Sequence, residues 1–355
     1  MTPESFVFQA LSNRVVFGAG SILNVKAEAD RLGMRRVLVL CTKQQTEAAE
    51  LITNHLGDAA IGICARAVMH TPVEVTKAAV EDLRALQADG IVSIGGGSTI
   101  GLGKALSVRT GLPQIAIPTT YAGSEMTPIL GETEDGTKTT RRDPAILPAT
   151  TIYDVDLTME LPHSLSVTSG MNAIAHAVEA LYAPDGNPII ALMAEESIRS
   201  IASAMRLITQ HPKNTEGRRL ALYGAWLAGT CLGSVSMSIH HKLCHTLGGS
   251  FDLPNAETHT IILPYATAYV AETVPEAMAA VRRALKTGGS AAEGLQQLAI
   301  DIGAPTRLAE IGMREEWLDR AAELAVANPY WAPKPFDRQA IRTLLGKAFS
   351  GERPR

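Results

Sequence analysis

Cysteine is scarce in this chain of 355 residues, and its spacing matches neither a disulfide framework nor a metal ribbon. Four cysteines, Cys41, Cys64, Cys231 and Cys244, form no close pair and no Cys-x-x-Cys motif. Free thiols of this kind fit a reducing compartment. The first five residues also lack the basic start and apolar stretch of a secretory signal. We therefore expect a cytoplasmic protein.

An excess of one charge sign and long apolar runs are missing too. Lys and Arg number 32 against 36 Asp and Glu, which gives a formal net charge of -4 without a long run of either sign. This balance argues against nucleic acid or a membrane surface as the partner. Every apolar run is interrupted before it could span a bilayer. With 46% hydrophobic residues the chain can bury a large core, so the expected partner is a small molecule.

Short β-branched runs alternate with amphipathic segments in the first part of the chain. Strands are expected at residues 36–41, 59–64, 90–94 and 114–118, and a helix at residues 73–87. Such alternation is typical of a parallel sheet with crossover helices. The loops that follow the strands are the expected ligand-binding positions.

After residue 160 the pattern changes to Ala-, Leu- and Met-rich segments with helical periodicity. Helices are expected at residues 165–183, 189–211, 216–236, 242–247, 264–272, 275–285, 291–302 and 314–327. We therefore predict an α/β dinucleotide-binding domain with a parallel sheet at residues 1–160, followed by an all-α catalytic domain at residues 161–355.

A glycine turn, residues 95–98, follows the expected strand at 90–94 and begins a helix. Backbone amides at such a turn can close around a pyrophosphate at the positive end of the helix dipole. The segment is not a P-loop, because Ser98 and Ala105 occupy two of its required positions, and Ile100 replaces the last glycine of the usual dinucleotide fingerprint. Alone, the turn fits a purely structural role equally well.

Two pairs of polar residues in the second half have helical spacing. Asn172 and His176 are one turn apart, as are His241 and His245, so each pair projects from one helix face. A lone histidine is more often structural than functional. The four histidines His240, His241, His245 and His259 in one short segment favour a functional site.

The segments 90–99, 118–125, 169–176 and 241–255 together resemble the iron-containing alcohol dehydrogenase family. The resemblance implies the dehydroquinate synthase-like fold and a divalent cation held by one Asp and three His.

Two of the four metal ligands that the resemblance implies are exchanged for amides. Asn172 stands in the place of the Asp and Asn255 in the place of the last His, whereas His176 and His241 remain. An amide offers only a neutral carbonyl oxygen, so this set lacks the charge and basicity that a divalent ion needs. We expect an enzyme that requires no metal.

The resemblance also assigns the cofactor, NADH or NADPH, to loop residues of the first domain. These are Gly96, Gly97, Ser98, Thr119, Thr120, Ser124, Lys138 and Thr42. NAD-selective relatives carry an Asp where this chain has Thr42, followed by Lys43. Thr does not repel a 2′-phosphate and Lys attracts it, so both cofactors are expected to bind.

Within the family, the amide ligands resemble the maleylacetate reductases, and the likeness extends over nearly the whole chain. Those enzymes saturate the carbon-carbon double bond of maleylacetate, giving 3-oxoadipate in the degradation of aromatic compounds. Hydride addition β to a ketone leaves an enolate, which is better stabilised than an alkoxide. Histidine hydrogen bonds can therefore replace a Lewis acid, and a nearby acid protonates the α carbon.

The expected catalytic residues are His241, His245, His176, Asn172 and Tyr330. His241 and His245 are the oxygen-stabilising and proton-donating pair, with the two roles left open. Tyr330 belongs to a loop, residues 328–331, that resembles one in maleylacetate reductases.

The substrate is a dicarboxylate, which needs cationic or donor groups at its carboxylates. The candidates are Arg142, Lys242, His259 and Tyr330. Related enzymes are often dimers, so a homodimer is expected.

Three other interpretations compete with this one. A metal-dependent alcohol or polyol dehydrogenase that tolerates Asn ligands would lose activity with a chelator. A catalytically silent nucleotide-binding protein would bind cofactor without turnover. A lyase of the dehydroquinate synthase type needs a metal and phosphate-binding basic residues that the sequence does not reveal.

Overall fold

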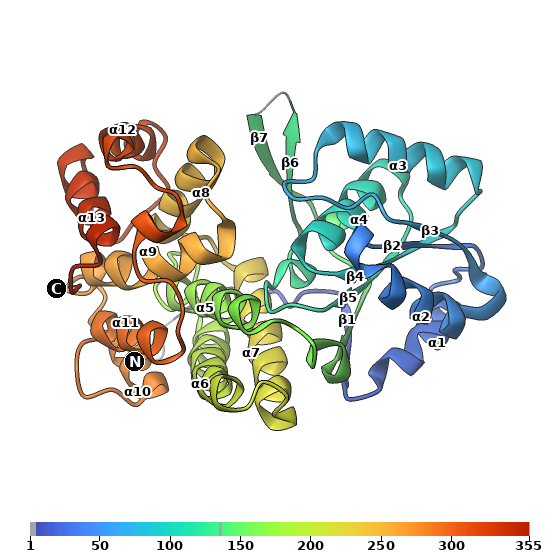
Figure 1. The fold of residues 1–355 in the computed structure, drawn as a ribbon, viewed down its shortest axis with the longest axis horizontal. Helices are drawn as coiled ribbons and strands as arrows, with labels where there is room; N and C mark the ends of the chain where they lie inside the picture. Colours follow the sequence, from blue (N-terminus) through green and yellow to red (C-terminus); the bar gives the residue numbers. More distant parts are fainter. Residues whose placement is uncertain (1–4, 135–136, 355) are drawn as a thin grey trace. The chain divides into compact units, whose positions relative to one another are not determined.

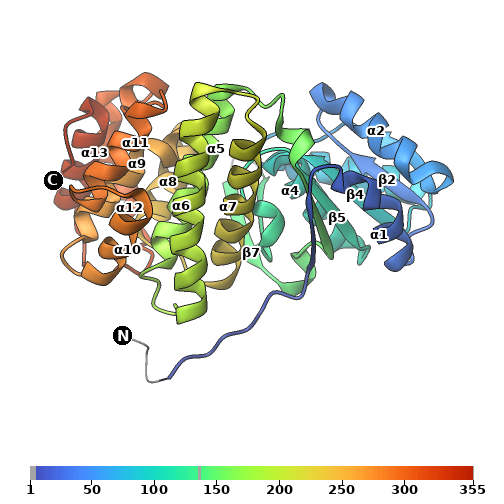
Figure 2. The ribbon, with the colours of Figure 1, turned by 90° about the horizontal axis from the view of Figure 1, so that it is seen from below.

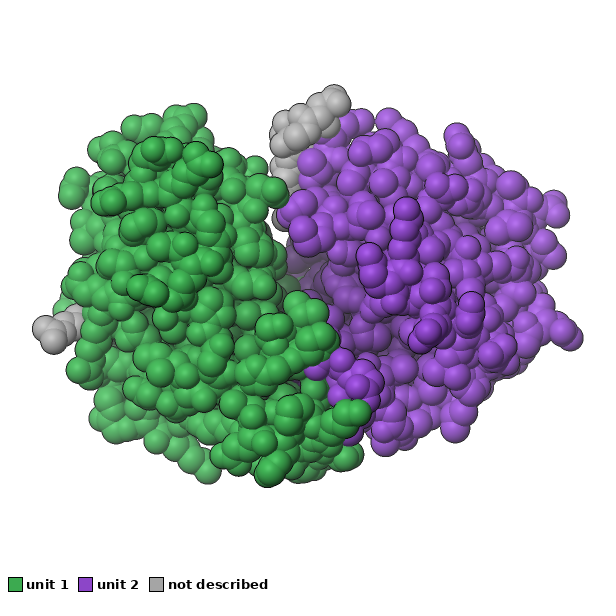
Figure 3. Space-filling model, in the orientation of Figure 1, with its two compact units in different colours: residues 1–9, 162–355 green, residues 10–161 purple. Residues whose placement is uncertain are grey.

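A computed structural model describes residues 5–134 and 137–354. The chain divides into two compact units, Ala10–Leu161 and Pro162–Arg355, the second of which includes the segment Met1–Gln9 (Figure 3). The predicted boundary after residue 160 lies one residue earlier. The prediction also placed residues 1–9 with the sheet, whereas Ser5 to Gln9 line a pocket with residues 184–187 of the helical unit.

Six parallel strands form the centre of the Ala10–Leu161 unit (Figure 1). They are β1 (Arg14–Gly18), β2 (Val37–Leu40), β3 (Ala60–Cys64), β4 (Gly90–Gly95), β5 (Gln114–Pro118) and β8 (Thr150–Asp154), in the order β1-β8-β5-β4-β2-β3. The four predicted strands are present, so the predicted parallel sheet is confirmed. The short strands β1 and β8 were not predicted.

Helices cover both faces of this sheet. The strand β2 alternates, with Val37 and Val39 packing under α1 (Val25–Arg31) and α2 (Thr46–Leu56). Leu38 and Leu40 face the other way, toward α3 (Val73–Ala85) and α4 (Gly97–Thr110). This alternation follows the period of two in a strand. An antiparallel hairpin, β6 (Ile129–Glu134) and β7 (Thr137–Arg142), is a separate small sheet that was not predicted.

The carboxyl ends of neighbouring strands gather the predicted nucleotide loops. Gly95 at the end of β4 is in register with Pro118 at the end of β5, and β2 lies on the other side of β4. The chain leaves β2 toward β3 and leaves β4 toward β5, in opposite directions across the sheet. Ligands of open α/β sheets bind in the crevice beyond such a switch point.

The second unit is helical throughout its described part (Figure 2). Its helices are α5 (His163–Ala180), α6 (Pro188–Gln210), α7 (Thr215–Ser234), α8 (Ile239–Phe251), α9 (Asn255–Val270), α10 (Pro275–Leu285), α11 (Ala291–Asp301), α12 (Leu318–Ala327) and α13 (Arg338–Ser350). Every residue of α5 from Ser166 to Ala180 is buried, and α5 packs against α6, α7 and α9. This buried helix carries Asn172, His176 and Glu179.

Three helices differ from the prediction. The helix α9 begins after Pro254 and contains Pro264, which the prediction took as a helix start. Packing against α5, α8 and α11 compensates for the hydrogen bond that this proline cannot donate. The helix α8 continues past its two glycines, and α13, which follows a proline-rich segment, was not predicted.

No single helix in the described ranges is long and apolar enough to cross a membrane. Only the pair α7 and α8 together reaches the required length and hydropathy, and the two helices are bent by 95° relative to each other.

Candidate active site

The glycine turn has the geometry of an anion-binding helix start. Gly95 has a φ of +150°, and a Cβ there would lie 2.6 Å from Gln45 Oε1 and from Thr99 Oγ1, so only glycine fits. Gly96 precedes α4, whose first turn contains no acidic residue and whose N-terminus has no side-chain cap. Free amides and the positive helix end favour a phosphate at this position.

Hydrogen bonds join three strand-end loops around this turn. Thr42 Oγ1 donates to Gln45 Oε1 at 3.0 Å, and Gln45 Nε2 donates to Thr119 Oγ1 at 3.1 Å. The Thr119 amide donates to the Gly95 carbonyl at 3.0 Å. A Cβ on Gly96 would lie 3.2 Å from Thr120 Cγ2. The structure thus brings the predicted loops together through Gln45, which the sequence pattern did not reveal.

Ser124 is positioned by a buried lysine on α4. Lys104 is fully buried, and its ammonium group donates to the Ser124 carbonyl, to Thr127 Oγ1 at 2.8 Å and to the Ile129 carbonyl at 3.0 Å. Burial lowers the pKa of Lys104 to about 7, against the opposing charge of Glu125. This lysine was not predicted. The side chain of the predicted ribose contact, Lys138, lies outside the described residues.

The predicted catalytic residues of the helical unit form a buried cluster. Asn172 and His176 lie on α5 and His241 on α8, and each side chain is less than 5% exposed. The rings of His176 and His241 stack at 5.1 Å between centroids. The ring of His245 lies 6.0 Å from that of His241. The structure therefore brings these four predicted residues together.

Glu179 fixes the tautomer of His241. Its carboxylate is completely buried and accepts three hydrogen bonds of 2.7 Å, from the Ser238 amide, the His240 amide and His241 Nδ1. The first two bonds cap α8, whose N-cap residue provides no side-chain cap of its own. A carboxylate only accepts, so Nδ1 of His241 carries the hydrogen. Nε2 of His241 is left buried with no partner among the described residues.

His245 has a different partner, the predicted Tyr330. The two groups, His245 Nδ1 and the Tyr330 hydroxyl, lie 2.9 Å apart. Burial raises the pKa of Tyr330, with a contribution from the charge of Glu179, so the phenol keeps its proton. A protonated phenol can donate to Nδ1 or accept from Nδ1–H, and the tautomer in which Tyr330 donates has the hydrogen of neutral His245 on Nε2. Tyr330 is 37% exposed, which places this pair at the edge of the cluster.

The other residues predicted to bind the substrate carboxylates differ in their positions and exposure. Lys242 has its ammonium group 5.7 Å from the ring centroid of Tyr330, and burial lowers the pKa of Lys242. It forms no ion pair within the described part of the chain. His259 is 3% exposed and hydrogen-bonded to His240 at 2.9 Å, so it is not open to a carboxylate. Arg142 is exposed on β7 of the other unit.

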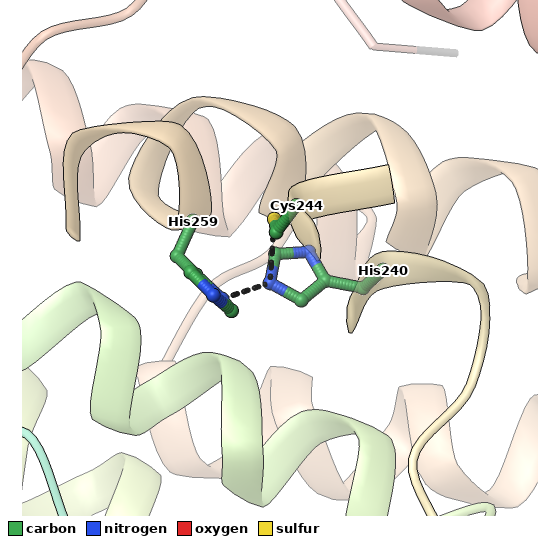
Figure 4. A group of neighbouring side chains, drawn as sticks. All are labelled: His240, Cys244 and His259. Carbon is green, nitrogen blue, oxygen red and sulfur yellow. Dashed lines mark hydrogen bonds between the residues drawn. The ribbon is translucent and has the colours of Figure 1, made fainter. Parts of the chain in front are cut away.

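Behind His241 lies a second group, His240, Cys244 and His259, which we call the inner cluster (Figure 4). Its three side chains come from α8 and α9 and are buried. Burial, together with neighbouring imidazoles, holds the pKa of His240 and of His259 well below the usual range, and the same holds for His176. These three rings are therefore neutral at physiological pH.

Both units of the chain match known protein families. Residues 12–155 match the family described as iron-containing alcohol dehydrogenase, and residues 166–349 match the Fe-containing alcohol dehydrogenase family, C-terminal. The chain is 56% identical to a maleylacetate reductase of Rhizobium sp. strain MTP-10005 over 99% of each chain. It is 53% identical to one of Sphingobium indicum, over 98% of this chain and 99% of the relative.

A solved structure is similar to this chain in both fold and sequence. The maleylacetate reductase of Agrobacterium tumefaciens superimposes with a TM-score of 0.96 at 55% identity, over 100% of both chains. This chain belongs to the iron-containing alcohol dehydrogenase family. The predicted fold class, an α/β nucleotide-binding domain followed by an all-α domain, is confirmed.

The donor set at the family's metal position does not fit a divalent ion in this chain. Asn172 Oδ1 and His241 Nε2 are buried without partners among the described residues, and His176 lies beside them, so two imidazoles and a neutral amide are available. Asn255 is exposed at the start of α9. The nearest carboxylate, Glu179, is already bound by three N–H groups. Without an anionic ligand, iron(II) or zinc has a poor set of donors here.

Proposed function

We propose that this chain reduces the carbon-carbon double bond of maleylacetate to 3-oxoadipate, with NADH or NADPH as the hydride donor and without a required metal. The observation that carries the proposal is the buried cluster of Asn172, His176 and His241, which keeps two imidazoles of a metal site but has, among the described residues, no free anion. Such a cluster can donate hydrogen bonds to an oxyanion. The curated relatives at 56% and 53% identity carry the same activity in their names.

The reaction needs one hydride and one proton. The bound dinucleotide supplies the hydride, which forms a new C–H bond at the carbon β to the ketone. The π electrons of the double bond then move toward the carbonyl group, and an enolate results. Protonation of the α carbon completes the saturated ketone. The protein must therefore stabilise one oxyanion and deliver one proton.

The hydrogen bonds of the two histidines assign these tasks. His245, with Nδ1 accepting from Tyr330, presents Nε2–H as a neutral donor for the enolate oxygen. His241, with Nδ1–H on the buried carboxylate of Glu179, is suited to carry a second proton on Nε2, because Glu179 compensates the charge of the imidazolium. His241 is thus the proton donor in this proposal and His245 the oxygen-stabilising group.

A dicarboxylate substrate suits the edge of this cluster. Lys242 is a half-buried cation without an ion-pair partner in the described residues, and it lies beside Tyr330 and one turn from His245. Burial disfavours the charged form of Lys242, and a substrate carboxylate bound to its ammonium group would compensate that cost.

The assembly state and the location belong to the proposal as well. Val7 is 88% exposed in an extended segment and is flanked by the exposed side chains of Phe6 and Phe8. Apolar side chains gathered in this way mark an interface, which supports a homodimer. Sedimentation equilibrium should give twice the mass of the chain, and a monomer would overturn this part. Four free, buried cysteines support a cytoplasmic location.

The test of the function is NADH oxidation with maleylacetate, followed by identification of the product. We expect 3-oxoadipate to form, at the same rate after exhaustive chelation and after addition of iron(II) or zinc. Replacing His245 with alanine should lower turnover and leave NADH binding near normal. Activity that returns only with added metal, on alcohols or polyols, would instead establish a metal-dependent dehydrogenase. Cofactor binding without turnover on any of these would establish a silent binding protein.

A further inference from the structure

The inner cluster combines three side chains that bind soft metal ions. His240 and Cys244 lie one turn apart on α8, and His259 lies opposite them on α9. Their ligand atoms, His240 Nε2, Cys244 Sγ and His259 Nδ1, all lie within 4.8 Å of one another. Figure 4 shows the side chains turned toward one another. Their exposed fractions are 1%, 2% and 3%, so this group is sealed from solvent.

Two of the three separations between these atoms lie close to the edges of a tetrahedral site. Bonds of about 2.05 Å to nitrogen and about 2.3 Å to sulfur place a nitrogen and a sulfur about 3.6 Å apart, and two nitrogens about 3.3 Å apart. In the structure, His240 Nε2 lies 3.6 Å from Cys244 Sγ and 2.9 Å from His259 Nδ1. The two rings need to separate by only about 0.4 Å for both edges to fit.

The chemistry of the cluster also suits an ion. The two ring nitrogens at 2.9 Å hold one hydrogen between them, and an ion can take its place. Cys244 supplies, as a thiolate, the negative charge that the family's metal position lacks in this chain. His240 Nδ1 is buried without a partner among the described residues, and it is not one of the three ligand atoms.

We infer that His240, Cys244 and His259 bind a thiophilic divalent ion of the zinc class, with a structural role at the contact between α8 and α9. The ring of His259 lies 5.0 Å from that of His241 and 6.1 Å from that of His176. The ion therefore stabilises the layer of side chains behind the active-site imidazoles. It is distinct from the family's metal position and takes no part in the proposed reduction.

Cobalt(II) is the probe that separates the two positions, because a thiolate ligand to cobalt gives an intense near-ultraviolet charge-transfer band that nitrogen and oxygen ligands do not give. Only the inner cluster contains sulfur. Since the ligands are buried, the full chain is produced in minimal medium with cobalt, so that the ion is present during folding. We expect stoichiometric cobalt in the purified protein, together with the charge-transfer band.

Two cysteine variants provide the matched comparison. Cys231 is as buried as Cys244, but its sulfur lies against the Ile190 carbonyl on neighbouring helices, so Cys231→Ala should keep the cobalt and the band. Cys244→Ala should lose both. A wild-type protein without stoichiometric cobalt, cobalt without the band, or a band that survives in Cys244→Ala would each overturn the inference. The wild-type spectrum is decisive even if Cys244→Ala does not fold.

Discussion

Replacing Glu179 with glutamine tests the hydrogen-bond arrangement on which the roles of the two histidines depend. In the wild type, Oε2 accepts from the Ser238 amide and from His241 Nδ1, while Oε1 accepts from the His240 amide. Glutamine keeps only one oxygen. The better orientation retains the two bonds of Oε2 and turns the NH₂ group against the His240 amide, which then has no acceptor.

The expected cost has two parts. A buried N–H without an acceptor costs about 1–3 kcal/mol, so the free energy of unfolding should fall by about that amount. The hydrogen bond from His241 also loses its charged acceptor, and such bonds contribute about 1.5–3 kcal/mol. If protonated His241 delivers the proton, turnover should fall about 10- to 150-fold. The KM for NADH should not change, because the cofactor loops belong to the other unit.

The assay combines denaturant unfolding with steady-state kinetics on maleylacetate. Glu195→Gln is the matched control, since Glu195 pairs at 2.7 Å with an exposed Arg283 on the surface. Exposed pairs contribute at most about 1 kcal/mol, so this control should have wild-type turnover. A Glu179→Gln protein with wild-type turnover and stability would refute the assignment of His241.

Three further substitutions test other parts of the site. Tyr330→Phe removes the hydroxyl that is hydrogen-bonded to His245. We expect turnover to fall about tenfold, as for the loss of one hydrogen bond, with unchanged thermal stability; turnover equal to that of the wild type would exclude this contact from the mechanism. Thr42→Asp places a carboxylate where a 2′-phosphate would lie, so the KM for NADPH should rise about tenfold or more and that for NADH should change little; equal changes for the two cofactors would show that Thr42 is not at the ribose. Lys104 has a pKa of about 7 in the folded state and a higher one unfolded, so the unfolded chain binds more protons between these values. The free energy of unfolding should therefore rise by about 1.4 kcal/mol per pH unit above pH 7 from this group. Lys104→Met should remove that rise in urea titrations at pH 7 to 9, and an unchanged slope would contradict the assignment.

The parts of the site that have a local signal could be predicted from the sequence. Helical spacing placed Asn172 with His176 and His241 with His245. The first pair lies on the predicted helix 165–183, whereas His241 lies one residue before the predicted helix 242–247, because α8 begins at Ile239. The glycine turn after β4 was predicted because a strand, a glycine run and a helix start follow one another directly. The place of Tyr330 came from resemblance alone, since no local pattern connects it with His245, 85 residues away.

The residues that were missed depend on contacts distant in the sequence. Gln45 reaches Thr119 across 74 residues only because β2, β4 and β5 are neighbours. Lys104 was missed because lysine is rarely buried, and its environment is built by the turn after β5. Glu179 lies on the predicted helix 165–183, but its task depends on the start of α8, 59 residues away. The cysteines were predicted as free thiols. His240 is one helical turn from Cys244, but His259 comes from α9, so the group of three depends on a contact between two helices.

The central claim, hydride addition to an alkene carbon, has a direct test. NADH carrying deuterium at the transferable position of the nicotinamide is oxidised with maleylacetate, and the product is analysed by NMR and mass spectrometry. The proposed reaction places the deuterium on the carbon β to an intact ketone, in 3-oxoadipate. Deuterium on a carbinol carbon, with the double bond retained, would mean that the chain reduces the carbonyl group as a metal-dependent alcohol dehydrogenase does, and would contradict the account.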